Sequence, residues 1–189
     1  IGDEHVAAVV KRLMADDMFT GWGVRTMSAA MQGFNPVSFY NGGVWPYDTA
    51  IAASGMKKHG YAKESNLLAW GLVEAAVAHE YSRLPELFCG FQRRSINKPV
   101  SFPMACSPAA ESAGALFLVL QAIVGVYAQA ELNTVFVHNP ALPQWLGEVT
   151  LGNLRVGRTT MRLRFRRHGG QSTFSVLDKE GPGRIIVVE

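Results

Sequence analysis

Two carboxylates stand in settings that suit acid–base chemistry. Glu86 follows Pro85 in a stretch without helical periodicity, and its next neighbours are mostly apolar. A rigid backbone can aim such a carboxylate into a cleft, where limited solvation suits it to proton transfer. The alternative is that Glu86 caps or pairs locally, and residue type alone favours that alternative. Asp48 is the second candidate, although the helix dipole equally explains a carboxylate in the first turn of a helix.

Three stretches of the sequence, two of which contain these carboxylates, are rich in glycine, aromatic residues and proline. Residues 16–47 in particular show little periodicity over more than thirty positions. Long loops of this kind inside compact domains are usually functional. The three stretches are Met18–Thr26 (MFTGWGVRT), Asn41–Ala50 (NGGVWPYDTA) and Arg83–Phe91 (RLPELFCGF), the last followed by Pro103–Ala109 (PMACSPA).

Apolar spacing predicts about four helices before residue 139, over 5–15, 48–59, 61–82 and 108–130. The last one begins with Ser107 as N-cap and Pro108 at the first helical position. The apolar stretch Ala113–Ala130 is interpreted as a fully buried helix, since it is shorter than the roughly 20 residues that span a bilayer. The helices are therefore the elements that must position the two long loops, residues 16–47 and 83–107.

After residue 139 the pattern changes to alternation. Apolar and arginine side chains alternate over 161–166, which predicts a strand with one face in water. Gly169 and Gly170 mark a turn, and further strands are predicted around Phe174 and over Ile185–Val188. The sequence thus predicts a small antiparallel sheet of three to five strands, so that residues 1–139 and 140–189 form two regions.

Composition excludes several classes of function. The chain has 189 residues, is 48% hydrophobic and carries a net charge of +3, which argues against a disordered chain. The basic residues of the tail alternate along a strand rather than cluster, so we expect no nucleic-acid or membrane partner. The five histidines and two cysteines show no metal-ligand spacing, no phosphate loop is present, and no cofactor is expected. The two cysteines form no Cys-x-x-Cys pair, which favours a reducing, cytoplasmic location.

With these three motifs in this order, the chain resembles the bacterial glycogen-debranching-like, amylo-α-1,6-glucosidase-type glycoside hydrolases. That resemblance covers nearly the whole chain, including the run of alternating arginines in the tail. It implies a mainly α fold: a partial (α/α)6 toroid of the six-hairpin glycosidase type over 1–139, with a small antiparallel β appendage over 140–189. It also implies a carboxy-terminal fragment, since the family's amino-terminal part is absent.

The resemblance further implies an inverting hydrolase of α-glucosidic linkages in an α-glucan. In such enzymes two carboxyl groups flank the bond, and the base activates a water. Glu86 is then the catalytic base, and the general acid lies in the missing amino-terminal part, so we expect the isolated fragment to be inactive. A helical body cut open exposes an apolar face, which predicts a homo-oligomer.

Five residues are the candidates for substrate binding. Tryptophan faces can cover the apolar face of a pyranose, and arginine can donate two hydrogen bonds to hydroxyls or hold a carboxylate. Ordinary packing and a structural ion pair are the alternatives. The candidates are Trp22, Arg25, Asn41, Trp45 and Asp48.

The second motif departs from the family's usual NGSVWPHDN at Gly43, Tyr47 and Thr49, which leaves the exact substrate open. Two other functions stay open beside the hydrolase. One is a non-catalytic carbohydrate-binding module that uses the aromatic loops. The other is a helical protein-interaction module.

Overall fold

The computed structural model describes residues 2–188, and the chain divides into two compact units. Unit 1 is Ile1–Val119 and unit 2 is Leu120–Glu189. The sequence predicts a boundary at 139/140 between a catalytic region and an appendage. That boundary stays a prediction. None of the described helices is long and apolar enough to cross a membrane.

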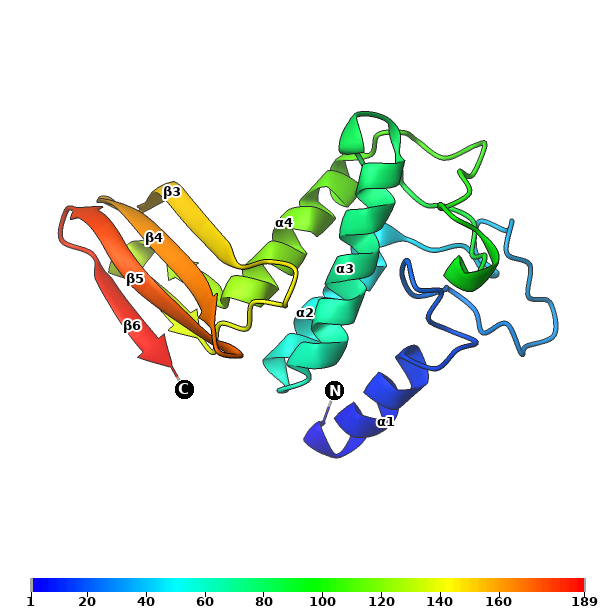
Figure 1. The fold of residues 1–189 in the computed structure, drawn as a ribbon, viewed down its shortest axis with the longest axis horizontal. Helices are drawn as coiled ribbons and strands as arrows, with labels where there is room; N and C mark the ends of the chain where they lie inside the picture. Colours follow the sequence, from blue (N-terminus) through cyan, green and yellow to red (C-terminus); the bar gives the residue numbers. More distant parts are fainter. Residues whose placement is uncertain (1, 189) are drawn as a thin grey trace. The chain divides into compact units, whose positions relative to one another are not determined.

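Unit 1 is built from helices joined by long loops. An adjacent pair, α2 and α3, makes the most extensive helix contact, and Figure 1 shows the two side by side. The elements are α1 (Asp3–Leu13), α2 (Pro46–Lys58), α3 (Ala62–Ala78), the 3-10 turns η1 (Glu80–Ser82) and η2 (Arg93–Ser95), and the first part of α4 (Ala110–Val124).

Small side chains allow α2 and α3 to pack closely. Ala50 and Ala53 of α2 and Leu68, Leu72 and Ala75 of α3 are completely buried. α2 begins with Pro46, whose ring suits the first helical position, and it carries two lysines in its last turn, which the helix dipole favours. The end of α3 then packs with residues of the long loops in one hydrophobic cluster: Trp22, Val44, Ala75, Ala76, Leu84 and Phe88, with Leu116 against it.

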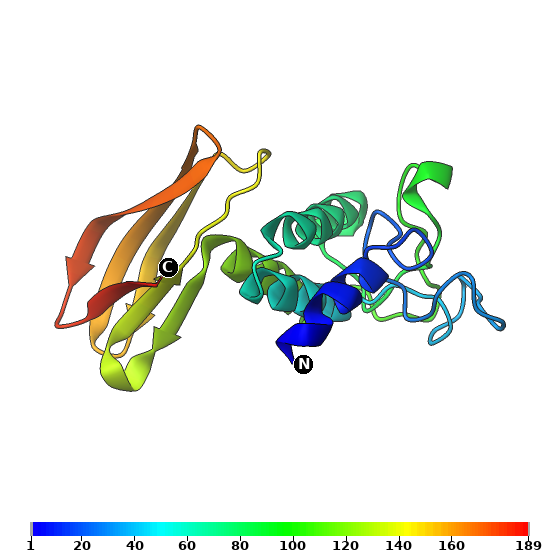
Figure 2. The same cartoon turned by 90° about the horizontal axis from the view of Figure 1, so that it is seen from below.

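Unit 2 contains two three-stranded sheets, which Figure 2 shows from a second direction. One has the order β1-β2-β6, with β1 antiparallel and β6 parallel to β2. The other is an antiparallel meander, β3-β4-β5. The strands are β1 (Val126–Gln129), β2 (Thr134–His138), β3 (Glu148–Val156), β4 (Thr159–His168), β5 (Gln171–Glu180) and β6 (Arg184–Val188), with the 3-10 turn η3 (Ala130–Leu132).

The predicted alternation is confirmed in β4. Met161, Leu163 and Phe165 are buried on one face, while Arg162 and Arg166 on the other face are exposed. The turn after His168 leads into β5 as expected. One expectation was wrong, because β6 pairs in parallel with β2 rather than extending an antiparallel sheet.

The prediction of a mainly α toroid is also wrong. Four α-helices are present, but only 35% of the described residues are helical and 26% lie in strands or bridges. The physical reason lies partly at residue 125. α4 ends at Val124 and the chain continues as β1, although the apolar run was expected to be one helix to Ala130. Gly125 has φ +68°, and a Cβ there would lie 2.0 Å from the His138 oxygen, so the helix stops where the chain must approach β2.

Candidate active site

The three predicted motifs and the segment after them lie next to one another in unit 1. Single antiparallel bridges join Arg25 to Val44, Val44 to Phe88, and Phe88 to Ser101. Val44 and Phe88 exchange two backbone hydrogen bonds, 2.9 and 3.0 Å long, and the Cys89 N–H donates to the Val100 oxygen at 2.8 Å. Isolated bridges thus link four loop segments side by side, without forming a regular sheet. This arrangement brings the candidate residues into one region of the unit.

Glu86 lies two residues before the central bridge and is half-buried. Its N–H donates to the Cys106 oxygen at 2.8 Å, and the Cys106 N–H donates to its carboxylate at 3.2 Å. Leu84, Leu87 and Phe88 around it are fully buried, so the backbone that carries Glu86 is anchored on both sides. One carboxylate oxygen of Glu86 therefore accepts a backbone hydrogen bond, and the residue keeps part of its surface accessible.

Arg25 is 4% exposed and holds loops together. Its Nε donates to the Gly90 oxygen at 2.8 Å and its Nη1 to the Asp16 oxygen at 3.2 Å, while its guanidinium lies 5.5 Å from the centre of the Phe34 ring. Burial lowers the pKa of Arg25 below its ordinary value. Its hydrogen-bond partners are backbone oxygens, so these contacts join the loops, while a contact with substrate stays a prediction.

The two candidate tryptophans differ in exposure. Trp22 is 4% exposed within the hydrophobic cluster, and the Arg93 guanidinium lies 4.4 Å from the centre of its ring. Trp45 is half-buried; its Nε1 donates to the Phe39 oxygen at 3.1 Å, and its ring meets the Phe39 ring edge to face at 4.9 Å. Phe39 also contacts Tyr40, which is 74% exposed. Of the two tryptophans, only Trp45 belongs to an aromatic surface that reaches solvent.

Asn41 and Asp48 are both exposed. The Asn41 N–H donates to the Ser38 hydroxyl at 3.1 Å, which shapes the loop and leaves the Asn41 side chain at the surface. Asp48 lies in the first turn of α2, three residues after Trp45. The second motif therefore presents two exposed polar side chains on either side of the half-buried tryptophan.

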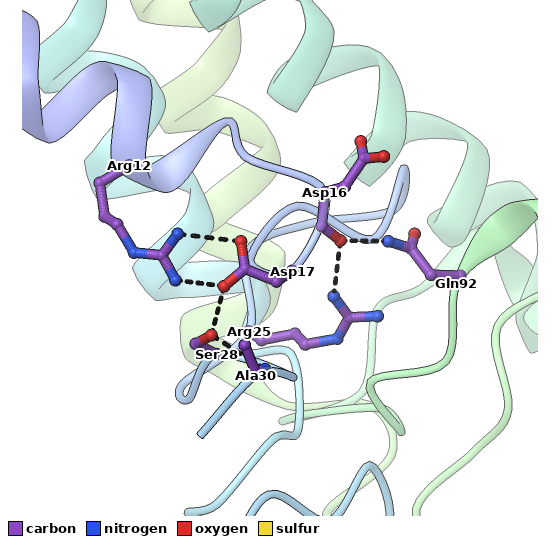
Figure 3. Close-up of polar contacts among 7 residues, drawn as sticks. All are labelled: Arg12, Asp16, Asp17, Arg25, Ser28, Ala30 and Gln92. Atoms are coloured by element: carbon purple, nitrogen blue, oxygen red, sulfur yellow. Dashed lines mark hydrogen bonds and ion pairs between the residues drawn. The ribbon is translucent and has the colours of Figure 1, made fainter.

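Sequence reasoning missed one polar cluster in this region. Asp17 accepts from both Arg12 guanidinium nitrogens Nη1 and Nη2 and from the Ser28 hydroxyl (Figure 3). These contacts hold the pKa of Asp17 well below its usual range. The spacing of an arginine on α1 and an aspartate five residues later was the available signal, but Ser28 is brought in only by the loop. The cluster ties α1 to the residues that flank the first motif on both sides.

No group of three or more His, Cys, Asp or Glu within residues 2–188 could hold a metal ion. The groups at this site that could act on a substrate are Glu86, the aromatic side chains and the exposed polar groups of the second motif.

Comparisons with known proteins bear on this region. A search of curated proteins finds no match. Residues 1–92, just under half of the chain, match the family of the mannosylglycerate hydrolase MGH1-like glycoside hydrolase domain. The matched segment includes all three motifs and Glu86, and it supports a glycoside hydrolase family for this chain.

Proposed function

We propose that this chain is part of a hydrolase of the debranching-like, amylo-α-1,6-glucosidase type, which cleaves α-glucosidic linkages of an α-glucan with inversion. Glu86 is the general base, and the general acid is a carboxyl group outside these 189 residues. The coarser assignment to glycoside hydrolases rests on the family match. The observation that supports the proposal is that isolated bridges join the three motif segments, the last of which carries the half-buried Glu86.

The chemistry requires Glu86 to accept one proton. Water attacks the anomeric carbon, its proton passes to the Glu86 carboxylate, and the electrons of the glycosidic bond leave with the departing oxygen, which the general acid protonates. The Cys106 N–H fixes one carboxylate oxygen of Glu86, so the other can face the water. Held geometry of this kind lowers the entropic part of the barrier.

The proposed contacts with substrate come from the second motif. Trp45 offers a partly exposed ring to the apolar face of a sugar. Asn41 and Asp48 are exposed residues of the same motif and can bond hydroxyls. Trp22 and Arg25 serve the same site indirectly, because both are buried and connect the loops.

A glucosyl fluoride tests the role of Glu86 without the general acid. Fluoride leaves without protonation, so the 189-residue chain should release fluoride from α-glucosyl fluoride although it does not turn over maltooligosaccharides or isomaltose. Glu86→Gln should lower fluoride release at least about 100-fold, since base catalysis contributes about 10²–10⁴-fold. Glu80→Gln, at an exposed glutamate of the same unit, is the control.

Proton NMR of the first sugar formed gives the stereochemistry. Release of the β-anomer supports inversion. Fluoride release that Glu86→Gln leaves unchanged, or turnover of maltooligosaccharide by the chain alone, would contradict the assignment of base and acid.

One observation favours a second function. The reciprocal hydrogen bonds between Glu86 and Cys106 are also what a purely structural glutamate would make. In that case the exposed aromatic residues bind saccharide without cleaving it. Saccharide binding that survives Glu86→Gln and weakens on Trp45→Ala, with no fluoride release by the unaltered chain, identifies this function.

The proposal includes a cytoplasmic location and self-association. Cys89 and Cys106 are both free thiols, in keeping with a reducing compartment. Leu67, Val77 and Phe117 of α3 and α4 are more than half exposed, and a second copy of the chain can cover such side chains. Light scattering of the purified chain measures this self-association, and a monomer at high concentration contradicts it.

A further inference from the structure

A surface hollow of about 520 Å³ lies between the first motif and the segment that follows the third. We call it the Asp16–Arg94 hollow. Its volume falls in the range of small-molecule sites, about 300–1,000 Å³. Neither Glu86 nor Trp45 lines it; its lining residues are Asp16, Phe19, Thr20, Gly21, Gln92, Arg93 and Arg94.

One wall of the hollow is fixed in place. The Gln92 amide nitrogen donates to the backbone oxygens of Asp16 and Phe19, and the Arg93 N–H donates to the Thr20 oxygen at 2.8 Å. These bonds join two segments that are more than 70 residues apart in the sequence. The hollow is therefore formed before any ligand binds.

Arg93 lines the hollow, but its side chain is not free to bind a ligand. It pairs with Glu74, and its guanidinium lies over the Trp22 ring. Gly21 passes so close that a Cβ there would lie 2.8 Å from the Arg93 Cβ, and its φ of +89° also favours glycine. The charge of Arg93 is thus already balanced within the protein.

The adjustable groups are Asp16 and Arg94. Their side chains are 87% and 71% exposed and lie 3.4 Å apart, an ion pair that contributes little to stability at the surface. Figure 3 shows the Asp16 carboxylate pointing away from the hydrogen bonds that its backbone oxygen accepts. A ligand can therefore bind both side chains without disturbing the loop contacts.

Asp16 offsets the charge of Arg94, and Glu74, which does not itself line the hollow, offsets that of Arg93. An ion of either sign would meet a like charge beside the opposite one, so the Asp16–Arg94 pair favours neither sign. A neutral molecule with many hydroxyls suits a carboxylate that accepts and a guanidinium that donates, with the Phe19 ring as an apolar wall. We propose that the Asp16–Arg94 hollow binds one neutral hexose unit of a saccharide. The inference rests on the proposed function only in taking the ligand to be a saccharide.

The test is a titration of the 189-residue chain with maltotetraose, followed by NMR. The Glu86→Gln background keeps the ligand intact. Asp16→Ala and Arg94→Ala each remove only an exposed side chain, and each should weaken binding about tenfold, as expected for one charged hydrogen bond. Arg158→Ala is the control, because Arg158 is an exposed arginine of unit 2.

Glucuronate provides the competing class of ligand. If Asp16→Ala tightens glucuronate binding and leaves maltotetraose unaffected, the hollow is an anion site and the proposal is overturned. It is also overturned if both variants bind maltotetraose like the unaltered chain, or if that chain does not bind it. Fluoride release that depends on Glu86 would then still support the proposed function. Conversely, weakened binding by both variants supports the hollow even where Glu86 proves non-catalytic.

Discussion

Replacing Arg25 by methionine tests whether this buried arginine stabilises the loops that carry the candidate site. The Gly90 oxygen would lose the one hydrogen-bond donor that it has among the described residues. An orphaned buried acceptor costs about 1–3 kcal/mol. The Asp16 oxygen loses Arg25 as well but keeps the Gln92 amide, so it adds little. Methionine fills much of the vacated space.

A second effect opposes the first. Arg25 is 4% exposed and has no carboxylate among its hydrogen-bond partners, so removing its charge relieves a desolvation cost. Because the backbone oxygens remain buried in the variant, we expect a net loss of about 1–2 kcal/mol in the free energy of unfolding.

Urea unfolding followed by tryptophan fluorescence measures this loss. Arg158→Met, at an exposed position, should change stability by less than about 0.5 kcal/mol. An Arg25→Met chain as stable as the unaltered one, or more stable, would refute the reasoning, since it would mean that desolvation outweighs the hydrogen bonds. The same variant should release fluoride from α-glucosyl fluoride more slowly than Arg158→Met, because Arg25 joins the loops next to Glu86.

Three further predictions concern pH and backbone geometry. The pKa of Asp17 is lower in the folded than in the unfolded chain. The contribution of Asp17 to stability is therefore complete above the unfolded pKa of about 3.9 and is lost as the pH falls below that value. Asp17→Asn should reduce the difference in stability between pH 6 and pH 3, and an unchanged difference contradicts the ion pair. Ser82 has φ +54°, so Ser82→Gly should raise the free energy of unfolding by about 1 kcal/mol, whereas a loss of stability would show that the side chain outweighs the strain. Gly125→Ala should destabilise unit 2 by more than Gly169→Ala does. Both residues have positive φ, but only at Gly125 does the added methyl group meet a backbone oxygen, that of His138. Thermal unfolding compares the two variants, and equal losses of stability count against the clash.

Local sequence patterns predicted many of the elements. The spacing of apolar residues placed four helices close to their observed positions, and the alternation around Met161 predicted β4. These patterns are local, since each depends on which residues share a face of one helix or strand. The order of the three motifs also pointed to a glycoside hydrolase, in agreement with the family match over residues 1–92.

The assembly of the elements was not predictable in the same way. The helix that was expected to run to Ala130 ends at Val124, and β6 lies parallel to β2. The end of the helix depends on the close approach of residue 125 to His138, and the parallel pairing joins strands about 50 residues apart. A local periodicity reports neither contact. The prediction of a mainly α toroid was wrong for this reason.

The same division applies to the candidate site. The sequence by itself determined which residue types were available: a glutamate after a proline, two tryptophans and an arginine in glycine-rich loops. Only the tertiary structure decided that Trp22 and Arg25 are buried among those loops, while Trp45 and Asp48 reach solvent. The physical reason is that exposure and hydrogen-bond partners are set by what packs against a residue from distant parts of the chain. The bridges among the segments around Arg25, Val44, Phe88 and Ser101 join such distant parts, and no local pattern reports them.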